Sequence, residues 1–361
     1  MRFGYWMPIF GGWLRNIEDE GMSTDWAYVR DLARESETLG FDLSLIAELN
    51  LNDIKGPQAP SLDAWTLAPA VAAVTDRLEL MLAVRPNYHA PALTAKSIST
   101  LETIAPGRVS LNVVSSWWAE EARQYGMPFD QHDARYARSS EWLTVLKRLL
   151  TEEEVSHQGD HYTLTGTRLE PKPRQPVPIY MGGESPTAKD LISQASDAYL
   201  MHGDLPDVIA GKIADLRARR EAAGLPPLRF GMAAYVICRD TPEEAEAERA
   251  RITDVKASPG AYASYQDFVR GSQLESAVSL EEYSVSNRGL RPELVGTPEQ
   301  IAARIREYEQ VGLDLLLIQF SPQREEMRRF GQQVIARYFA PEVSGEAGVA
   351  LPSVRQKVQA T

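Results

Sequence analysis

Apolar and polar residues alternate along the chain with two different periods. Short runs with apolar residues at every position or every second position predict β-strands, and longer stretches with apolar residues every three to four positions predict amphipathic helices. The strands are expected at residues 2–9, 41–48, 77–84, 108–114, 178–183, 197–203, 229–240 and 313–320. The helices are expected at residues 25–39, 62–74, 91–105, 117–125, 132–151, 186–195, 207–223, 242–253, 298–311 and 324–337.

This order of elements indicates an α/β fold. Eight strands, each followed by a helix, is the count of a closed parallel barrel, so we expect a (β/α)8 TIM barrel with insertions. An open, doubly wound sheet is the structural alternative. It is less favoured because no Gly-x-Gly-x-x-Gly motif follows the first strand.

Residues 1–340 are expected to form a single barrel domain with two insertions. Residues 152–178 predict a small hairpin followed by a proline-rich crossover. Residues 254–296 form a long polar insertion, and insertions of this length in a compact domain often act as lids. We therefore expect residues 275–292 to become ordered over the barrel mouth when a ligand binds. Residues 341–361 are expected to be a C-terminal tail or an arm that embraces another subunit.

Composition narrows the partners and the compartment. The 361 residues carry a formal net charge of -12, which argues against nucleic acid and anionic membrane surfaces, since both select for an excess of Lys and Arg. The single cysteine, Cys238, is too few for an intramolecular disulfide or a cysteine-based metal site. No apolar run approaches the roughly 20 residues of a membrane-spanning helix, and the first residues do not have the pattern of a secretory signal. We expect a cytoplasmic globular protein.

Polar residues at the strand ends are the candidates for chemistry, because functional groups of such barrels gather where strands end and helices begin. Asn112 lies inside an apolar strand, so its amide bonds either neighbouring backbone or a ligand. Ser185 precedes a helix with Pro186 in its first turn. It is either a simple helix N-cap or, with Gly182 and Gly183, part of a phosphate site.

Aromatic residues and histidines leave similar alternatives open. Trp117 and Trp118 either cover the barrel rim or place one indole in the wall of a pocket. His89 and His202 are candidates for acid–base or anion-binding roles, although a lone histidine is more often structural. The sequence shows no Ser–His–Asp order, metal-ligand cluster or P-loop, which suggests that a cofactor supplies the chemistry.

Three motifs occur in order along the chain: "RVSLNVVSSWWAEEARQYG" (108–126), "QHDARYARSSEW" (131–142) and "PIYMGGES" (178–185). Together they resemble the bacterial luciferase-like flavin monooxygenases, and within them the FMNH2-dependent enzymes that act on alkanesulfonates and dimethyl sulfone. The resemblance implies a barrel that binds reduced FMN, supplied by a separate NAD(P)H-dependent flavin reductase, and uses O2 to oxygenate an organosulfur substrate. It also implies a homodimer or homotetramer.

The resemblance also assigns roles to individual positions. Contacts to the flavin are implied for Glu48, Asn112, Glu121, Arg135, Tyr136, Gly182, Gly183 and Ser185, the last three at the phosphate. The candidate catalytic residues are His89, Trp117, His202 and Tyr235. The candidate substrate contacts are Asn50, Arg85, Arg288, Arg291 and Gln319. No metal ligands are expected.

The substrate is where the sequence departs from the alkanesulfonate branch. That branch carries an Arg and a His on strand seven, where this chain has Ala233 and Tyr235. Several cations nevertheless suggest an anion clamp, so the main expectation is oxidative C–S cleavage of an alkanesulfonate or sulfosugar to an aldehyde and sulfite. The alternatives are a dimethyl sulfone monooxygenase, which yields methanesulfinate, a pyrimidine-type oxygenase, a deazaflavin- or FMN-dependent dehydrogenase, and a non-catalytic flavin-binding barrel.

Overall fold

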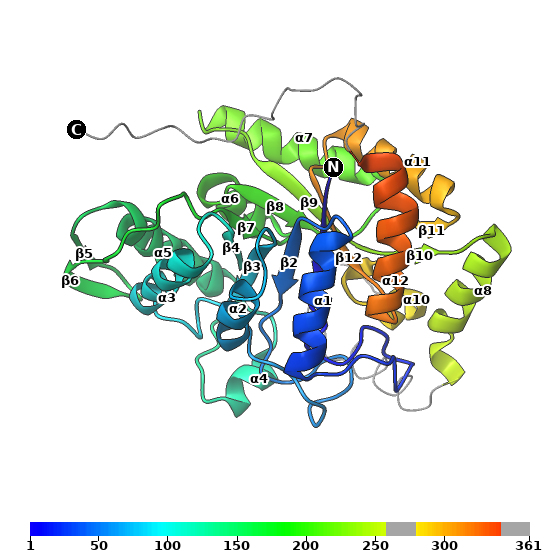
Figure 1. The fold of residues 1–361 in the computed structure, drawn as a ribbon. Helices are drawn as coiled ribbons and strands as arrows, with labels where there is room; N and C mark the ends of the chain where they lie inside the picture. The colour runs from blue at the N-terminus through cyan, green and yellow to red at the C-terminus, as the bar shows by residue number, and fades with distance from the viewer. Residues whose placement is uncertain (258–278, 341–361) are drawn as a thin grey trace, which may run out of the picture.

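Eight parallel strands close into a barrel in the computed structural model, which describes residues 1–257 and 279–340 (Figure 1). Around the barrel the order is β1, β2, β3, β4, β7, β8, β9 and β12, and β12 pairs with β1 to close it. The strands are β1 (Arg2–Trp6), β2 (Leu43–Ile46), β3 (Glu79–Val84), β4 (Val109–Val113), β7 (Ile179–Met181), β8 (Ala198–Met201), β9 (Arg229–Tyr235) and β12 (Leu315–Gln319). The predicted (β/α)8 fold is confirmed, and the open sheet is excluded.

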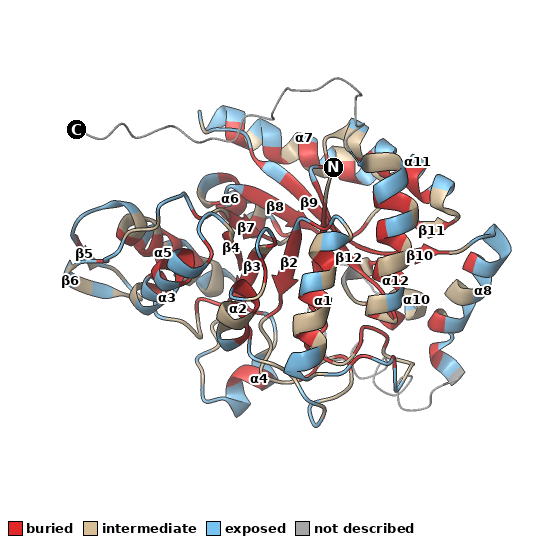
Figure 2. Ribbon diagram, viewed as in Figure 1, coloured by how far each residue is buried: buried red, intermediate tan, exposed pale blue. Residues whose placement is uncertain are grey.

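Helices surround the barrel and bury one face each, as the burial colours of Figure 2 show. They are α1 (Trp26–Thr38), α2 (Ala64–Ala72), α3 (Pro91–Ile104), α4 (Ala119–Gln124), α5 (His132–Thr151), α6 (Pro186–Ala195), α7 (Pro206–Ala222), α8 (Pro242–Thr253), α10 (Leu280–Ser284), α11 (Pro298–Val311) and α12 (Gln323–Phe330). Shorter or irregular turns are η1 (Val255–Ala257), η2 (Ser286–Arg288) and the π-helix η3 (Gly331–Phe339), into which α12 continues. No helix in the described ranges is long and apolar enough to cross a membrane.

The first strand shows which side chains face the barrel interior. Phe3 packs edge-on against Phe330 and Phe339 of the outer helices, with ring centroids 5.7 and 5.2 Å away. A Cβ on Gly4 would instead lie 2.8 Å from Leu43 Cδ2, on the opposite face. Because side chains alternate along a strand, the even-numbered residues of β1 point into the barrel.

The pairing register of the strands shows which side chains of the other strands face the barrel interior. At the amino-terminal end of the interior, Arg2 pairs with Glu79 (2.7 Å), and Ser110 Oγ donates to Glu79 Oε1 (2.6 Å). Asn112, two residues beyond Ser110, therefore points inward as well, near the carboxyl-terminal end. Trp6 takes the same orientation at the end of β1.

One predicted strand was wrong in its extent. The run 229–240 leaves the barrel after Tyr235, and Ile237–Cys238 (β10) pairs with Val295–Gly296 (β11) in a separate two-stranded sheet. Both parts are buried, so the apolar run is continuous and its periodicity does not show the break. As a consequence α8 packs beside β10 and β11 at the edge of the molecule, and α11 lies next to α7 in the helical ring (Figure 1).

Two other predicted elements also end differently. The first strand stops at Trp6 rather than residue 9, because the chain turns into the loop that begins at Met7. The expected helix at 117–125 is confined to Ala119–Gln124. It does not begin earlier, since the backbone at Ser116 has a positive φ and is not helical.

The insertion at 152–178 contains the antiparallel pair β5 (Val155–Gln158) and β6 (Thr163–Thr167). Glu141 of α5 holds the turn between them: its carboxylate accepts from the backbone N–H of His161 (2.9 Å) and Tyr162 (2.8 Å) and contacts His157 Nε2 (3.1 Å). The expectations for the C-terminal tail and for residues 258–278 of the lid insertion lie outside the described residues.

Candidate functional site

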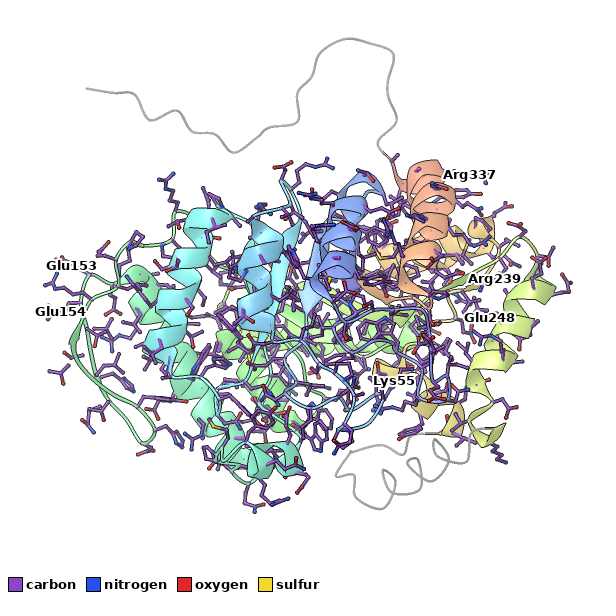
Figure 3. All side chains as sticks on the ribbon, turned by 60° about the horizontal axis from the view of Figure 1, so that its bottom comes forward. Lys55, Glu153, Glu154, Arg239, Glu248 and Arg337 are labelled. Atoms are coloured by element: carbon purple, nitrogen blue, oxygen red, sulfur yellow. The ribbon has the colours of Figure 1, made fainter. Side chains whose placement is uncertain are left out.

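The carboxyl-terminal ends of the barrel strands and the loops that follow them form the mouth of the barrel. Figure 3 turns this face toward the viewer, with Lys55 of the β2–α2 loop on it and Glu153 and Glu154 at the outer edge of the molecule. Alternation along the strands points five candidate side chains inward here: Trp6, Arg85, Asn112, His202 and Gln319. Four of them were predicted from the sequence, and Trp6 was not. Tyr235, which was also predicted, packs in a second apolar cluster with Leu14, Ala245 and Ile252.

The loop between β7 and α6 has the geometry of an anion cradle. Gly183 has φ +145°, and a Cβ there would lie 2.6 Å from Ala188 Cβ, so only glycine fits without a shift. Ser185 caps α6 by accepting from the Ala188 N–H (3.1 Å), which confirms the N-cap interpretation. The same hydroxyl still has a proton to donate, and it lies at the positive end of a ten-residue helix.

Tyr136, at the start of α5, reaches this cradle from the neighbouring strand connection, and Arg135 precedes it in the chain. Tyr136 OH lies 3.3 Å from the position that a Cβ on Gly183 would take. The Arg135 guanidinium lies over the Phe129 ring (4.7 Å), and its Nε is screened from solvent without an acceptor in the described part of the chain. The "RY" and "GGES" motifs, about 45 residues apart in sequence, are thus brought to one place.

Strand β4 delivers two polar groups to the mouth. Asn112 is 7% exposed, and its Oδ1 is buried without a donor among the residues described. Ser115 accepts from Ser139 Oγ of α5 (3.0 Å), whereas Ser116 has φ +58° and a buried hydroxyl that has no partner in residues 1–257 and 279–340. A non-glycine residue in this backbone region is strained, and such strain concentrates at functional sites.

Arg85 is the centre of a buried ionic network. Its backbone N–H and Nε donate to Glu48 Oε2 (2.8 and 3.3 Å), and its Nη1 pairs with Glu121 Oε2. The guanidinium also lies 4.0 Å from the centroid of the Tyr88 ring, and burial raises the pKa of that phenol to about 12. Two carboxylates therefore already neutralise this cation.

Glu121 also fixes the loop after β2. Its Oε1 accepts from the backbone N–H groups of Asn50 (2.5 Å) and Leu51 (3.3 Å), and Tyr125 OH donates to the Asn50 carbonyl (3.0 Å). The Glu121 side chain is fully buried. Glu121 and the backbone of Asn50 thus join α4 to the β2–α2 loop, and this contact fixes the position of the loop.

His89 completes the network on the solvent side. Its Nε2 contacts Glu48 Oε1, its ring lies 5.2 Å from that of Trp65, and its carbonyl accepts from Trp142 Nε1 (2.8 Å). The imidazole remains 25% exposed. A histidine held by a carboxylate and open on one side can exchange a proton with a ligand or with water.

A second charged cluster surrounds His202. Desolvation lowers the pKa of His202 to about 4, although its side chain is accessible to solvent in this structure. Burial alone would raise the pKa of Glu184, but its pairs with Lys212 (2.8 Å) and Arg288 (2.8 Å) lower it to about 2. Arg291 pairs with Glu282 and lies 3.5 Å from Asp204.

The segment after α10 covers the β9–β12 side of the mouth. Gln319 exchanges hydrogen bonds with Ser286 (3.0 and 3.3 Å), and the Tyr235 N–H donates to the Gly289 carbonyl (2.7 Å). Burial raises the pKa of the Tyr235 phenol well above its ordinary value. Gln319 and Tyr235 therefore bind this cover, and Tyr235 stays protonated near neutral pH.

Trp117 stands at the rim. It is 52% exposed and stacks on Trp118, with ring centroids 5.6 Å apart and planes 9° from parallel. The two indoles form an aromatic platform that directly follows Ser116 in the chain. The exposed face is free to contact a planar ligand.

Comparison with known proteins places this geometry in a family. A sequence model of the luciferase-like monooxygenases matches residues 1–315. The chain belongs to the luciferase-like monooxygenase family. The resemblance read from the three motifs is thereby confirmed, and with it the expectation that the protein is an enzyme.

Two curated relatives of this luciferase-like monooxygenase are described as FMNH2-dependent dimethylsulfone monooxygenases. The Pseudomonas putida protein is 34% identical and covers 97% of this chain and 99% of its own; the Pseudomonas fluorescens (strain Pf0-1) protein is 33% identical and covers 93% of each. A solved long-chain alkane monooxygenase has a TM-score of 0.79 at 19% identity, over 96% of this chain and 94% of its own. At that identity the likeness shows the fold alone.

Sequence reasoning missed two indole N–H groups of this luciferase-like monooxygenase that are buried without partners among its described residues, those of Trp6 and Trp65. The alternation Arg2, Gly4, Trp6 was a usable signal, because it places Trp6 on the polar, inward face of β1. Trp65 carries no such signal, since its surroundings come from elements distant in sequence.

Proposed function

We propose that this protein is an FMNH2-dependent monooxygenase that uses O2 to oxygenate a small, uncharged organosulfur compound, with dimethyl sulfone as the substrate that the relatives suggest. Reduced FMN would come from a separate flavin reductase. The observation that carries the proposal is the pairing of the candidate cations at the mouth with carboxylates of the same chain.

The residues of the site fit reduced FMN. The glycine cradle, the Ser185 hydroxyl and the N-terminus of α6 suit the phosphate, with the Tyr136 hydroxyl beside Gly183. Asn112 Oδ1 is a buried acceptor that needs a donor, and the flavin ring offers N–H groups. Bound reduced FMN supplies the electrons that activate O2.

Charge favours an uncharged substrate over a sulfonate. Arg85 lies between Glu48 and Glu121, Arg288 pairs with Glu184, and Arg291 pairs with Glu282. The Arg85–Glu121 pair is buried, and breaking a buried pair costs about 3–5 kcal/mol, which a sulfonate bound to Arg85 would have to offset before gaining affinity. His202, with its lowered pKa, is neutral near pH 7 and adds no positive charge.

Two loops are arranged to keep water from the reaction. Leu14, in the β1–α1 loop, forms an antiparallel bridge with Val285, and the Arg15 N–H donates to the Ser284 carbonyl (3.2 Å). Together with the Gln319–Ser286 contact, these bonds close the β9–β12–β1 side. The α4 side, with the exposed Trp117, is then the side through which ligands enter.

The test is a coupled assay with FMN, NADH and a flavin reductase, in which O2 uptake and products are measured with dimethyl sulfone or with an alkanesulfonate. Dimethyl sulfone should be consumed with O2 to give methanesulfinate, formaldehyde and water, which balances the two electrons from the flavin. Release of sulfite from an alkanesulfonate, with no turnover of the sulfone, would reject the uncharged-substrate proposal. No substrate-dependent O2 uptake would reject oxygenation altogether.

A further inference from the structure

The indole N–H of Trp6 is a hydrogen-bond donor that the fold leaves without an acceptor. Its Nε1 is buried and has no partner in the described ranges. The neighbouring Trp13, whose ring lies 6.4 Å away, donates its own N–H to Gln323 Oε1 (2.8 Å). Trp142 donates likewise to the His89 carbonyl (2.8 Å). Two other buried indoles thus have acceptors, whereas the N–H groups of Trp6 and Trp65 have none among the described residues.

The position of Trp6 makes the unpaired donor meaningful. Trp6 is the last residue of β1, faces the barrel interior, and shares its register with Leu45 of β2. It thus belongs to the floor of the mouth. The nitrogen is screened from solvent in this structure, and a bound acceptor can reach it only if neighbouring side chains move. A buried donor without a partner is destabilising, and a bound acceptor removes that cost.

The chemistry of a sulfone matches a donor of this kind. A sulfone presents two oxygen acceptors and no N–H or O–H group, so Asn112 Oδ1, which is an acceptor, cannot bind it. The arginines of the mouth are already paired with carboxylates. An uncharged N–H beside apolar side chains binds an uncharged sulfonyl oxygen without requiring a counter-ion.

We infer that Trp6 is a specificity-determining residue whose indole N–H donates to a sulfonyl oxygen of the substrate and orients it above the floor of the barrel. The inference rests on the proposed function, because it names the contact by which that site selects a sulfone.

The experiment compares Trp6→Phe with the matched variant Trp13→Phe in the coupled assay with dimethyl sulfone. Trp6→Phe keeps a ring of similar shape and loses only the N–H, so KM should rise about tenfold, the effect of one hydrogen bond, with FMN affinity unchanged. Its thermal midpoint should stay the same or rise, because an unpaired donor is removed. Trp13→Phe should lower the midpoint, since it loses the bond to Gln323, and leave KM within about twofold.

The outcomes separate the inference from the function on which it rests. A wild-type enzyme that turns over dimethyl sulfone, with an unchanged KM in Trp6→Phe, overturns the role of Trp6 and leaves the proposed function standing. A drop in the thermal midpoint of Trp6→Phe as large as that of Trp13→Phe also overturns it, because the N–H would then have an internal partner. A wild-type enzyme inactive on sulfones overturns both.

Discussion

Single atoms decide the shape of the β7–α6 loop, the proposed phosphate cradle. At Gly183 the absence of a Cβ lets the β7–α6 loop pass Ala188 and Tyr136 with a φ of +145°. Tyr199 OH holds the Gly183 carbonyl (2.9 Å), so the peptide cannot rotate freely to relieve a clash. Any side chain at this position must displace the first turn of α6 or the loop itself.

Replacing Gly183 with alanine should therefore weaken flavin binding. We expect the Kd for reduced FMN to rise at least about tenfold and the free energy of unfolding to fall by about 1–3 kcal/mol, since the added Cβ meets Ala188 at 2.6 Å. Gly211→Ala is the control, because it adds a methyl group in open space on α7 and should leave FMN binding unchanged. Anaerobic fluorescence titration measures the affinity; wild-type affinity in Gly183→Ala would place the phosphate elsewhere.

At the scale of elements, a buried ion pair fastens the β1–α1 loop over the mouth. Lys55 donates to the Leu14 carbonyl (2.7 Å) and to Glu20 Oε1 (2.6 Å). Glu20, whose side chain is fully buried, accepts in turn from the backbone N–H of Trp13 (2.9 Å). The loop therefore owes its position to a cation from the β2–α2 loop as well as to its own sequence.

Lys55→Met should release this loop. The substitution keeps most of the apolar stem and leaves the Glu20 carboxylate buried without its cation, so we expect a loss of about 3–5 kcal/mol in denaturant unfolding. Faster proteolysis within residues 13–22 should accompany it. Arg123→Ala removes an exposed pair with Glu120 on α4 and should change neither measurement. Equal stability of the two variants would show that the Lys55 pair does not hold the loop.

At the scale of the whole molecule, ion pairs connect the segment 279–296 to strands far away in the sequence. Arg288 pairs with Glu184 after β7, and Arg291 lies 3.5 Å from Asp204 after β8. The cover of the mouth is thus attached by charge on one side of the barrel and by the Gln319–Ser286 hydrogen bonds on the other. Its attachment therefore depends on pH.

The acid stability of the enzyme should show this dependence. The pKa of Glu184 is lowered from 4.5 to about 2, so the folded state binds this proton less readily than the unfolded state, and the stability it contributes is lost as pH falls from 4.5 toward 2. Glu184→Gln should be less stable than the wild type near pH 7. The difference in stability between the two proteins should become smaller as pH falls from 4.5 toward 2. Thermal midpoints measured from pH 7 to pH 2 test this.

His202 provides the comparison for that experiment. Its pKa is lowered from 6.5 to about 4, so the wild type loses stability from this group as pH falls from 6.5 to 4. His202→Gln should reduce the loss of stability between pH 6.5 and pH 4. It should leave the loss of stability between pH 4.5 and pH 2 unchanged. A constant stability difference between Glu184→Gln and the wild type at every pH would contradict the assignment of the acid transition to Glu184.

Local patterns were sufficient for the barrel and for the flavin motifs. Eight apolar runs, each with a following helix, gave the strand count, and the inward position of Asn112 follows from alternation on β4. The same patterns failed at Tyr235, where burial on both sides of the chain conceals the change from the barrel to the β10–β11 sheet. They also placed α8 in the ring of helices around the barrel, at the position that α11 occupies. The periodicity of apolar residues shows which positions are buried, but it does not show which other element buries them.

The amino-acid sequence by itself determined the fold and the family, because strand and helix periodicity, glycine positions and caps act over a few residues. The tertiary structure alone decided the charge of the site. Arg85 meets Glu121, 36 residues away, and Arg288 meets Glu184, 104 residues away, so cations that suggested a sulfonate clamp are neutralised within the fold. Coulomb interactions depend on distance in space, and only folding sets that distance.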